Sequence, residues 1–456
     1  MSPFTKSKSE APDRMSGAYL AVWRWHFYAG VLVMPFLMLL ALTGGLYLFK
    51  DEIDQVANRR MIQIPHAATE TAPEAWIASA AQAGGGRAAS ILLPAAADQA
   101  VRVRVDRPDG VQKTVFVDPH TARVTGVTDF GGVTETLKKL HSLSLFSGTT
   151  GKALNILIEI VAGWTIVLCA TGIYLWWPRR RQGAVLVPRE TDARRRPFWR
   201  DLHALVGLYV GGIILFLAVT GMPWSAVWGD QVMGLVKASG WGRPPAPVAG
   251  AWQRAEHDDH PAGAGWTMEG VVLPAPSHDR HDLTAVVTAA EVRDLPRPYT
   301  VSIPVQADTA YTVTAQVRRV QDSRTLYIDP AKGAVLADIG FDRFGPGAKA
   351  IEWGVYTHQG TQFGQINRLI MLAGCIGVWL LGLSGLMMWW KRRPPRLSRA
   401  SLGAPTAPPG PRVRFAVLGI VIPLCILYPL TGLSLVTVLL LDFASRRLMR
   451  PRPVVS

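Results

Sequence analysis

The sequence predicts an α-helical integral membrane protein with about five transmembrane helices, an internal duplication and two small α+β domains outside the membrane. Three features lead to this fold class. Hydrophobic residues make up 49% of the 456 residues, and many of them stand in uninterrupted runs. Basic residues gather beside the ends of these runs, and several short motifs occur twice in the same order.

Five apolar runs reach the ~20 residues that an α-helix needs to cross the hydrocarbon core of a bilayer. Glu159 is the one formal charge inside them. The first run is longer than the ~7–15 apolar residues of a signal peptide, and KDEID follows it in place of a small-residue cleavage site, which predicts a retained anchor. The runs are Phe27–Phe49, Ala153–Trp177, Ala204–Gly229, Leu369–Trp390 and Phe415–Leu441.

The positive charge predicts the orientation. The chain carries a formal charge of +15, with eight arginines in 179–200 and seven basic residues without an acid in 391–414. By the positive-inside rule, these loops and the short N-terminal tail are cytoplasmic. The segment after the fifth run, SRRLMRPRP, departs from this rule. Because the basic residues adjoin span ends and form no separate domain, we expect no nucleic-acid partner.

These features divide the chain into alternating tails, spans, outer domains and basic loops. The predicted partners include the lipid bilayer, and the predicted location is the inner membrane of a bacterium, with several passes and a cytoplasmic N-terminus. The predicted segments are a tail at 1–26, spans at 27–49, 152–177, 203–229, 368–390 and 415–441, periplasmic domains at 50–151 and 230–367, basic loops at 178–202 and 391–414, and a C-terminal tail at 442–456.

The three cysteines exclude a disulfide framework in the outer domains and a cysteine-ligated iron–sulfur cluster. Cys169, Cys375 and Cys425 all lie within apolar runs, so no disulfides hold the outer domains together. A cysteine-ligated iron–sulfur cluster needs about four thiolates, and the chain has fewer.

A histidine heads each half of a duplication. WRWHFYAG contains His26 and WRDLHALVG contains His203, and each histidine is followed by glycine after four residues and by Thr-Gly after seventeen. Further on, LKKLHSLSLF contains His141 and GVYTHQGTQF contains His358, before spans that end in GIYLWWPRR and GLMMWWKRR. The unit therefore occurs over 24–180 and again over 200–393. Membrane proteins with internal repeats often place the functional site between the halves.

The outer domains repeat as well. VFVDPHTARV (115–124) and LYIDPAKGAV (326–335) each predict a strand, a tight turn and a strand. TAPEAWIASAAQAG predicts a helix, and ETLKKLHSLSLF predicts a second helix that carries His141. Further predicted strands are Ala100–Val105, Lys113–Val117, Trp266–Leu273, Tyr299–Pro304, Tyr311–Val317 and Arg324–Ile328.

The Asp-Pro turns, the histidine-headed spans and the Trp-Trp-basic endings resemble the PepSY-associated transmembrane proteins. That family includes inner-membrane ferric-siderophore reductases and other iron-regulated membrane proteins of Gram-negative bacteria. The resemblance extends over roughly residues 20–440. It implies PepSY-like outer domains, haem bound by histidines at span ends, and electron transfer outward to a ferric chelate. Some relatives carry a fused flavin- and nicotinamide-binding domain, but this chain lacks the G-x-G-x-x-G turn of such a domain.

The histidines themselves also favour haem. An electron-transfer haem takes two strong axial ligands, which two neutral imidazoles supply. We name His26 and His203 the inner pair, and His141 and His358 the outer pair. The prediction is two haem b groups, since no C-x-x-C-H occurs for covalent attachment, with Gly30 and Gly207 leaving room for the macrocycle. A crossed pairing, a single haem, and histidines that merely lie among lipid headgroups are the alternatives.

Other candidate residues carry weaker signals. Glu159 is an acid inside a span, where it could pair with Arg368 or relay a proton. Trp224 and Trp228 suit an interfacial aromatic belt or a contact to an outer ligand. Two H-x-x-H spacings among acids suit either a metal or a solvated loop, and they comprise His257, His260, His278 and His281.

The expected function is a membrane haem oxidoreductase that passes electrons from the cytoplasmic side to a periplasmic acceptor. By resemblance that acceptor is a ferric siderophore, and the donor would be reduced flavin, a flavoprotein or a quinol. One alternative is a haem or siderophore transporter, which predicts helices broken near the bilayer midplane, at Pro35, Pro423 or Pro429. Another is a non-catalytic PepSY binding or regulatory module, which gives no reason for matched histidines.

Overall fold

The computed structural model describes residues 17–67, 69–145, 148–180, 187, 189–243, 283–304, 310–329, 333–392, 422–423 and 426–448. The chain separates into two compact units. The first consists of 1–41, 156–219 and 376–456, and the second of 42–155 and 220–375. We describe each unit by itself.

Among the described residues, four helices are long and apolar enough to cross a membrane. They are α1 (Gly17–Tyr47), α5 (Gly148–Arg180), α6 (Arg196–Gly221) and α10 (Gly364–Trp390), and they correspond to the first four predicted spans. α1 continues through Pro35.

The predicted fifth span is not supported by the described residues. There, the run at 415–441 yields α12 (Pro429–Leu448), whose apolar section is Pro429–Val438. Residues 415–421, 424 and 425 of this run lie outside the described residues. Pro429 begins this helix, in keeping with the preference of proline for the first helical turn.

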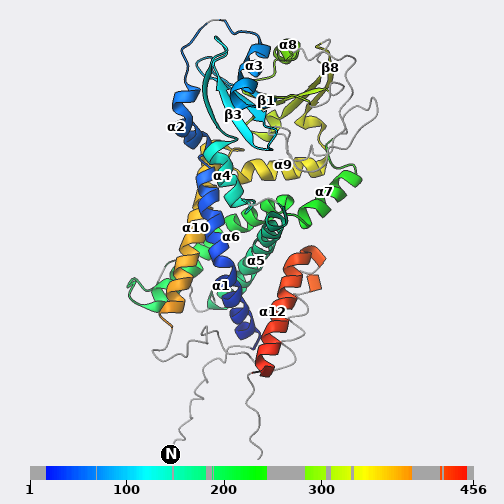
Figure 1. Ribbon diagram of the computed structural model, residues 1–456. Coiled ribbons are helices and arrows are strands. Elements are labelled where there is room, and N and C mark those ends of the chain that lie inside the picture. Colours follow the sequence, from blue (N-terminus) through cyan, green and yellow to red (C-terminus); the bar gives the residue numbers. More distant parts are fainter. Residues whose placement is uncertain are drawn as a thin grey trace, which may run out of the picture. The chain divides into compact units, whose positions relative to one another are not determined.

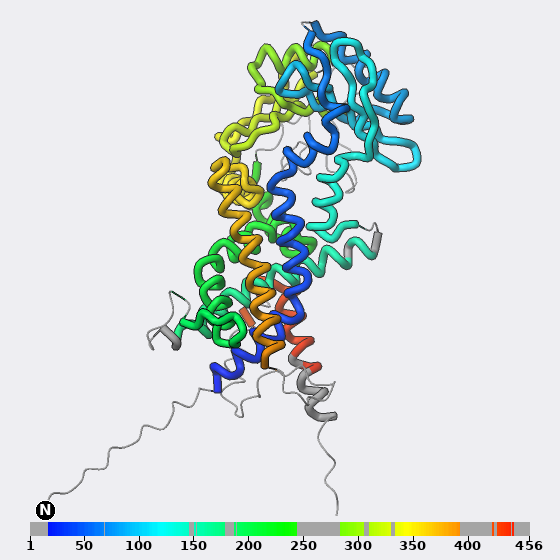
Figure 2. Tube along the Cα trace, turned by 90° about the vertical axis from the view of Figure 1, so that its left-hand side faces the viewer, coloured from blue at the N-terminus to red at the C-terminus, as the bar shows by residue number. Residues whose placement is uncertain are grey.

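The first unit packs its helices through small residues. α1 and α10 lie side by side (Figure 2), and the Trp379 indole N–H donates to the Met38 carbonyl across 3.1 Å. A Cβ atom built on Gly382 would lie 2.8 Å from the Met38 sulfur, so a larger residue there would displace the methionine side chain. An apolar cluster formed by α1, α5 and α12 comprises Ala29, Val33, Val161, Trp164 and Leu435.

The second unit is built on one antiparallel sheet of eight strands, in the order β4-β3-β2-β1-β5-β6-β7-β8. The first four strands come from the first predicted outer domain and the last four from the second. The strands are β1 (Arg87–Leu93), β2 (Val101–Asp106), β3 (Gln112–Val117), β4 (Val124–Asp129), β5 (Tyr299–Ser302), β6 (Tyr311–Ala315), β7 (Arg324–Ile328) and β8 (Val335–Gly340).

The prediction of two separate outer domains is therefore wrong. β1 pairs with β5, and Ile91 lies opposite Val301 in the register. Both side chains are fully buried. Each half alone would expose an edge strand at this point, and joining the halves removes both edges.

Two helices cover the same face of the sheet, α3 (Pro73–Gly84) over the first half and α8 (Leu283–Val292) over the second (Figure 1). Because side chains alternate along a strand, Val101, Val103 and Val105 of β2 face this core. The residues between them, Arg102 and Arg104, belong to the opposite, polar face.

The remaining helices of the second unit surround the sheet and lead toward the long helices. α4 and α9 each end at a histidine of the outer pair, and each precedes a long helix in the chain. These elements are α2 (Lys50–Ile62), α4 (Gly132–His141), α7 (Trp228–Ala238) and α9 (Pro346–His358), with short turns η1 (Met222–Trp224), η3 (Val320–Asp322) and η4 (Phe341–Arg343).

The predicted helix around Trp76 and the helix carrying His141 are present as α3 and α4. The predicted strands match β2, β3, β5, β6 and β7, and the Asp-Pro turns lead into β4 and β8. β1 was missed, because its segment RAASILL is buried on nearly every residue and lacks a two-residue alternation. The predicted strand Trp266–Leu273 lies outside the described residues.

Candidate functional site: two pairs of histidines

The inner pair lies entirely within the first unit. His26 comes from α1 and His203 from α6, one from each half of the duplication. Their ring centres are 6.3 Å apart and the rings are nearly perpendicular, at 87°. The distance alone also suits an ordinary edge-to-face ring contact. The hydrogen bonds of the ring nitrogens therefore decide what the pair can do.

A hydroxyl group holds Nδ1 of His26. The Thr171 Oγ1 atom of α5 lies 2.8 Å from it, and the same hydroxyl donates its proton to the Val167 carbonyl at 2.7 Å. Because a hydroxyl has a single proton, Thr171 must accept from the imidazole. Nδ1 of His26 therefore carries the proton, and Nε2 keeps its lone pair.

His203 is held in the same way. Its Nδ1 lies 3.1 Å from Ser384 Oγ and 3.2 Å from the Leu381 carbonyl oxygen, both on α10. Ser384 donates its own proton to the Leu380 carbonyl at 2.6 Å. A carbonyl can only accept, so Nδ1 of His203 is also the protonated nitrogen.

The outer pair lies within the second unit and follows the same pattern. The Thr43 hydroxyl is 3.0 Å from Nδ1 of His141, and the Thr220 hydroxyl is 2.8 Å from Nδ1 of His358. Burial, and to a smaller extent the nearby His141, lower the pKa of His358 to about 3. Trp224 meets the His358 ring edge to face, with ring centres 5.9 Å apart. The His358 imidazole is therefore neutral.

All four histidines share one kind of partner, a hydroxyl residue followed by glycine. A Cβ atom on Gly44 would lie only 3.0 Å from Cε1 of His141, so this glycine makes room for the imidazole, whereas on the other three glycines it would be in ordinary contact with the ring at 3.5 to 3.8 Å. The sequence showed two of these dipeptides as matched spacings, but it did not show their role. The partners are Thr171-Gly172 for His26, Ser384-Gly385 for His203, Thr43-Gly44 for His141 and Thr220-Gly221 for His358.

Two neutral imidazoles with free Nε2 atoms suit a metal centre that takes two protein ligands. In the inner pair, His26 and His203 would be the two ligands of such a centre. Within the described residues, no group of three or more His, Cys, Asp or Glu side chains could hold a bare metal ion. Haem, which brings four nitrogen ligands of its own, fits this donor set.

The glycines predicted to leave room for a macrocycle differ in their surroundings. A Cβ atom on Gly30 would meet nothing within 4 Å, whereas one on Gly207 would lie 3.7 Å from a methyl carbon of Leu381. The open space beside Gly30, one turn after His26, fits the prediction better than the space beside Gly207.

Arg368, one candidate partner of Glu159, has a carboxylate partner within its own unit. Arg368 forms an ion pair with Glu52 of α2 and stacks over the Phe49 ring at 5.1 Å. Glu52 follows the end of α1 directly, so the nearest carboxylate to Arg368 comes from outside the spans. Glu159 lies fully buried in α5.

The remaining predicted site residues are two tryptophans and four histidines. Trp224 lies in η1 beside His358, and Trp228 begins α7. The two H-x-x-H segments, with His257, His260, His278 and His281, lie outside the described residues.

Comparison with known families gives an independent result. The model of the PepSY-associated TM region matches residues 23–392, which include all four histidines and all eight strands. A comparison with curated proteins finds no significant match. The matched region covers most of the chain and begins and ends with the duplicated unit. The chain therefore belongs to the PepSY-associated TM region family.

Proposed function

We propose that this protein is a haem-containing membrane oxidoreductase that passes electrons from the cytoplasmic side to a periplasmic acceptor, most simply a ferric siderophore. The observation that carries the proposal is the repeated arrangement at the four histidines. Each imidazole has Nδ1 tied to a hydroxyl group, and each belongs to a pair drawn from the two halves of the duplication.

His26 and His203 would hold one haem b, and His141 and His358 a second. When bound, each haem supplies an iron that cycles between Fe(III) and Fe(II). The chain's own contribution is to present neutral imidazoles in one tautomer, since the hydroxyl acceptors keep the proton on Nδ1 and leave Nε2 for the metal. Such hydrogen-bond partners orient a histidine ligand and raise its basicity.

The acceptor would receive one electron per ferric ion at the outer pair. Hard oxygen ligands hold Fe(III) tightly and the softer Fe(II) less tightly, so reduction releases the metal from a siderophore. Trp224, edge-on to His358, is a candidate surface for the chelate. The electrons would come from reduced flavin, a flavoprotein or a quinol on the cytoplasmic side.

The transporter alternative has less support. It requires helices broken near the midplane, yet α1 continues through Pro35 and the other three candidate spans are continuous helices. A purely regulatory PepSY module would leave the four hydroxyl-held histidines without a role.

The test replaces one histidine of each pair in the full-length protein. H203A and H358A should each lose about half of the haem, because an axial imidazole replaced by a methyl group leaves one ligand. H120A is the matched control, since His120 lies between β3 and β4 and its half-buried ring bonds the carbonyls of Thr69 and Ala97. Haem content is measured by pyridine extraction, and reduction of a ferric chelate is measured in oriented vesicles.

The two variants should fail differently. H203A should block electron entry from the cytoplasmic side while an outer haem stays reducible from outside, and H358A should block delivery to the chelate. The proposal would be overturned if both variants kept their full haem content and full reduction of the chelate. It would also be overturned if the wild-type protein, purified from haem-replete cells, contained no haem.

A further inference from the structure

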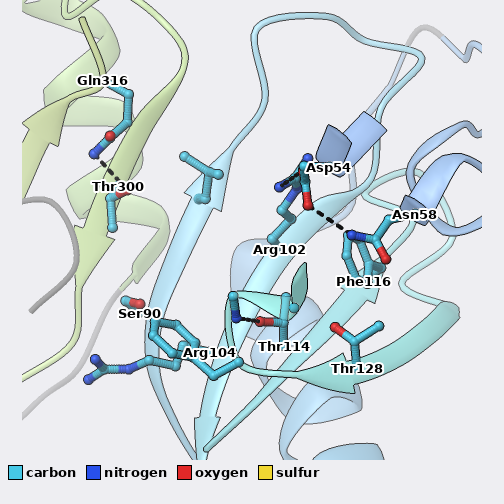
Figure 3. A pocket seen from close by; sticks show the side chains of 14 residues that line it. Asp54, Asn58, Ser90, Arg102, Arg104, Thr114, Phe116, Thr128, Thr300 and Gln316 are labelled. Carbon is cyan, nitrogen blue, oxygen red and sulfur yellow. Dashed lines mark hydrogen bonds and ion pairs between the residues drawn. The ribbon is translucent and has the colours of Figure 1, made fainter. Parts of the chain in front are cut away.

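A polar pocket lies on the face of the sheet that α3 and α8 leave uncovered. It has a volume of about 240 Å³ and belongs entirely to the second unit. Figure 3 shows its floor, where side chains of neighbouring strands point to one side. Hydroxyl and guanidinium groups dominate the floor, and they come from Ser90, Arg102, Arg104, Thr114, Thr128 and Thr300.

Arg104 is the central feature of this pocket. Its side chain is only 12% exposed, yet its Nε atom is buried and makes no hydrogen bond. The nearest carboxylate oxygen, Oδ1 of Asp106, lies 3.4 Å away and also lacks a hydrogen bond. The guanidinium packs over Phe130 at 5.6 Å. The contact with Asp106 is thus an ion pair that leaves the buried Nε–H of Arg104 without a hydrogen bond, and a buried donor of this kind favours an added acceptor.

Arg102 adds a second guanidinium two residues away on the same face. It pairs with Asp54 at 2.6 Å, and Asp54 also accepts a hydrogen bond from Asn58 at 2.8 Å. Each arginine of the lining is paired with one carboxylate, Arg102 with Asp54 and Arg104 with Asp106. An anion in the pocket would therefore be held by N–H and O–H donors and not by an excess of charge.

The start of α4 supplies a third feature that attracts anions. Gly131 and Gly132 line the pocket, and no side chain caps this helix. The first N–H groups of a helix have no partners within the helix, and its N-terminus carries a partial positive charge. Gly131 is left-handed, with φ of 67°, so glycine both permits the turn and keeps a side chain out of the pocket.

We propose that this pocket binds a small multivalent oxyanion, with carboxylate or phosphate oxygens. Arg104 would donate from its guanidinium, whose planar N–H groups carboxylates and phosphates match with paired hydrogen bonds. Arg102 and the start of α4 would bind the remaining oxygens, and the threonine hydroxyls could donate or accept. Apolar ligands find little support in this lining.

The position of the pocket suggests what the oxyanion could affect. α4 has the pocket at its first residue and His141 at its last. Ten residues of helix extend for ~15 Å, so one rigid element links the oxyanion to the outer pair. The proposal itself does not depend on haem, because binding can be measured on the protein without any redox reaction.

The experiment measures calorimetric binding of citrate and, separately, of inorganic phosphate to the full-length protein in detergent. The oxyanions should bind the wild type, whereas uncharged glycerol should not. R104Q should weaken binding by about tenfold or more, the effect of losing a charge-assisted hydrogen bond. The matched control is R107Q, which makes the same charge change in the exposed turn after β2, outside the pocket.

A conservative variant shows whether a loss of binding comes from the altered side chain or from misfolding. R104K keeps the charge but loses the planar fork, and it should weaken binding less than R104Q. Thermal unfolding of each variant, with and without citrate, shows whether the fold persists and whether the ligand stabilises it. If citrate binds more strongly than phosphate, the ligand of the pocket is a carboxylate. If phosphate binds more strongly, the ligand is a phosphate. No binding to the wild type, or equal weakening by R104Q and R107Q, would overturn the proposal.

Discussion

At the residue scale, the central feature is a hydroxyl group on Nδ1 of every histidine in the two pairs. A neutral imidazole can carry its proton on either nitrogen, and only a fixed Nδ1–H leaves Nε2 free for a metal. Thr171 and Ser384 are pure acceptors toward their histidines, because their protons go to backbone carbonyls. The chain therefore chooses the tautomer before any ligand binds.

Replacing Thr171 with valine should loosen the inner site without removing its ligand. Valine keeps the shape of threonine but cannot accept from His26, and loss of such a partner typically weakens metal binding by about 10–100-fold. Haem retention during washing should fall in T171V, while the outer site stays unchanged. Absorption spectra and pyridine extraction measure the loss.

The control for this change lies one and a half turns earlier in the same helix. Thr165 is buried and its hydroxyl bonds only the Val161 carbonyl, so T165V removes a hydroxyl without touching a histidine. T165V should retain haem as the wild type does. Equal losses in T171V and T165V would show that the effect is one of helix packing and not of the imidazole.

At the scale of elements, the joint between β1 and β5 turns two repeats into one sheet. Ile91 is fully buried at this joint, opposite Val301. I91A should cost about 2–5 kcal/mol, the range for an aliphatic core residue cut to alanine. Because the core is continuous, amides of β3 and β6 should lose hydrogen-exchange protection together. Loss confined to the first half would mean that the halves unfold independently.

V111A is the matched control for I91A. Val111 is 43% exposed in the turn between β2 and β3, so removing its methyl groups leaves the core intact. Its exchange pattern should equal that of the wild type.

A cross-strand ion pair ties the last strand to the sheet. Arg324 of β7 forms two hydrogen bonds with Asp338 of β8, at 2.9 and 2.7 Å, and this pairing lowers the pKa of Asp338. A lowered carboxylate pKa contributes stability above the unfolded pKa of ~3.9, and this contribution disappears as pH falls through the folded pKa. D338N should cost about 1 kcal/mol near neutral pH, given its partial exposure.

The pH dependence separates this effect from a general loss of packing. The difference between D338N and the wild type should shrink in thermal unfolding below pH 4 and vanish at still lower pH. D129N is the comparison in the other half of the sheet. Asp129 pairs with Lys113 but is 82% exposed, so its replacement should matter less. A pH-independent D338N defect would contradict the assignment to the ion pair.

At the scale of the whole molecule, the charge asymmetry predicts that the sheet lies outside and the segment between α5 and α6 inside. Arg107, in an exposed turn of the sheet, and Asp192, before α6, are suitable labelling positions. In a background without the native cysteines, R107C should react with a membrane-impermeant maleimide in spheroplasts. D192C should react only after permeabilisation. The opposite pattern would reverse the proposed direction of electron flow.

The sequence alone predicted the four long spans, both histidine pairs and most strands. These features are local: the length of an apolar run determines whether a helix can span a bilayer, and a two-residue alternation marks a half-buried strand. The duplication then linked His26 with His203 and His141 with His358, because repeated sequence implies equivalent depth. The predicted fifth span lies partly outside the described residues, which show α12 from Pro429 onward and leave this span a prediction.

The tertiary structure decided which groups meet. The hydroxyl partners of His26 and His203 are 145 and 181 residues away in the chain, too far for any periodicity to pair them. The merging of two predicted domains depended on β1 and β5, segments separated by the whole of α5, α6 and α7. The oxyanion pocket likewise collects side chains from α2, α4 and five strands. The local sequence pattern determines which segments become helices or strands. Which of these segments touch one another depends on side-chain packing between parts of the chain that are far apart in sequence, and this packing exists only in the folded protein.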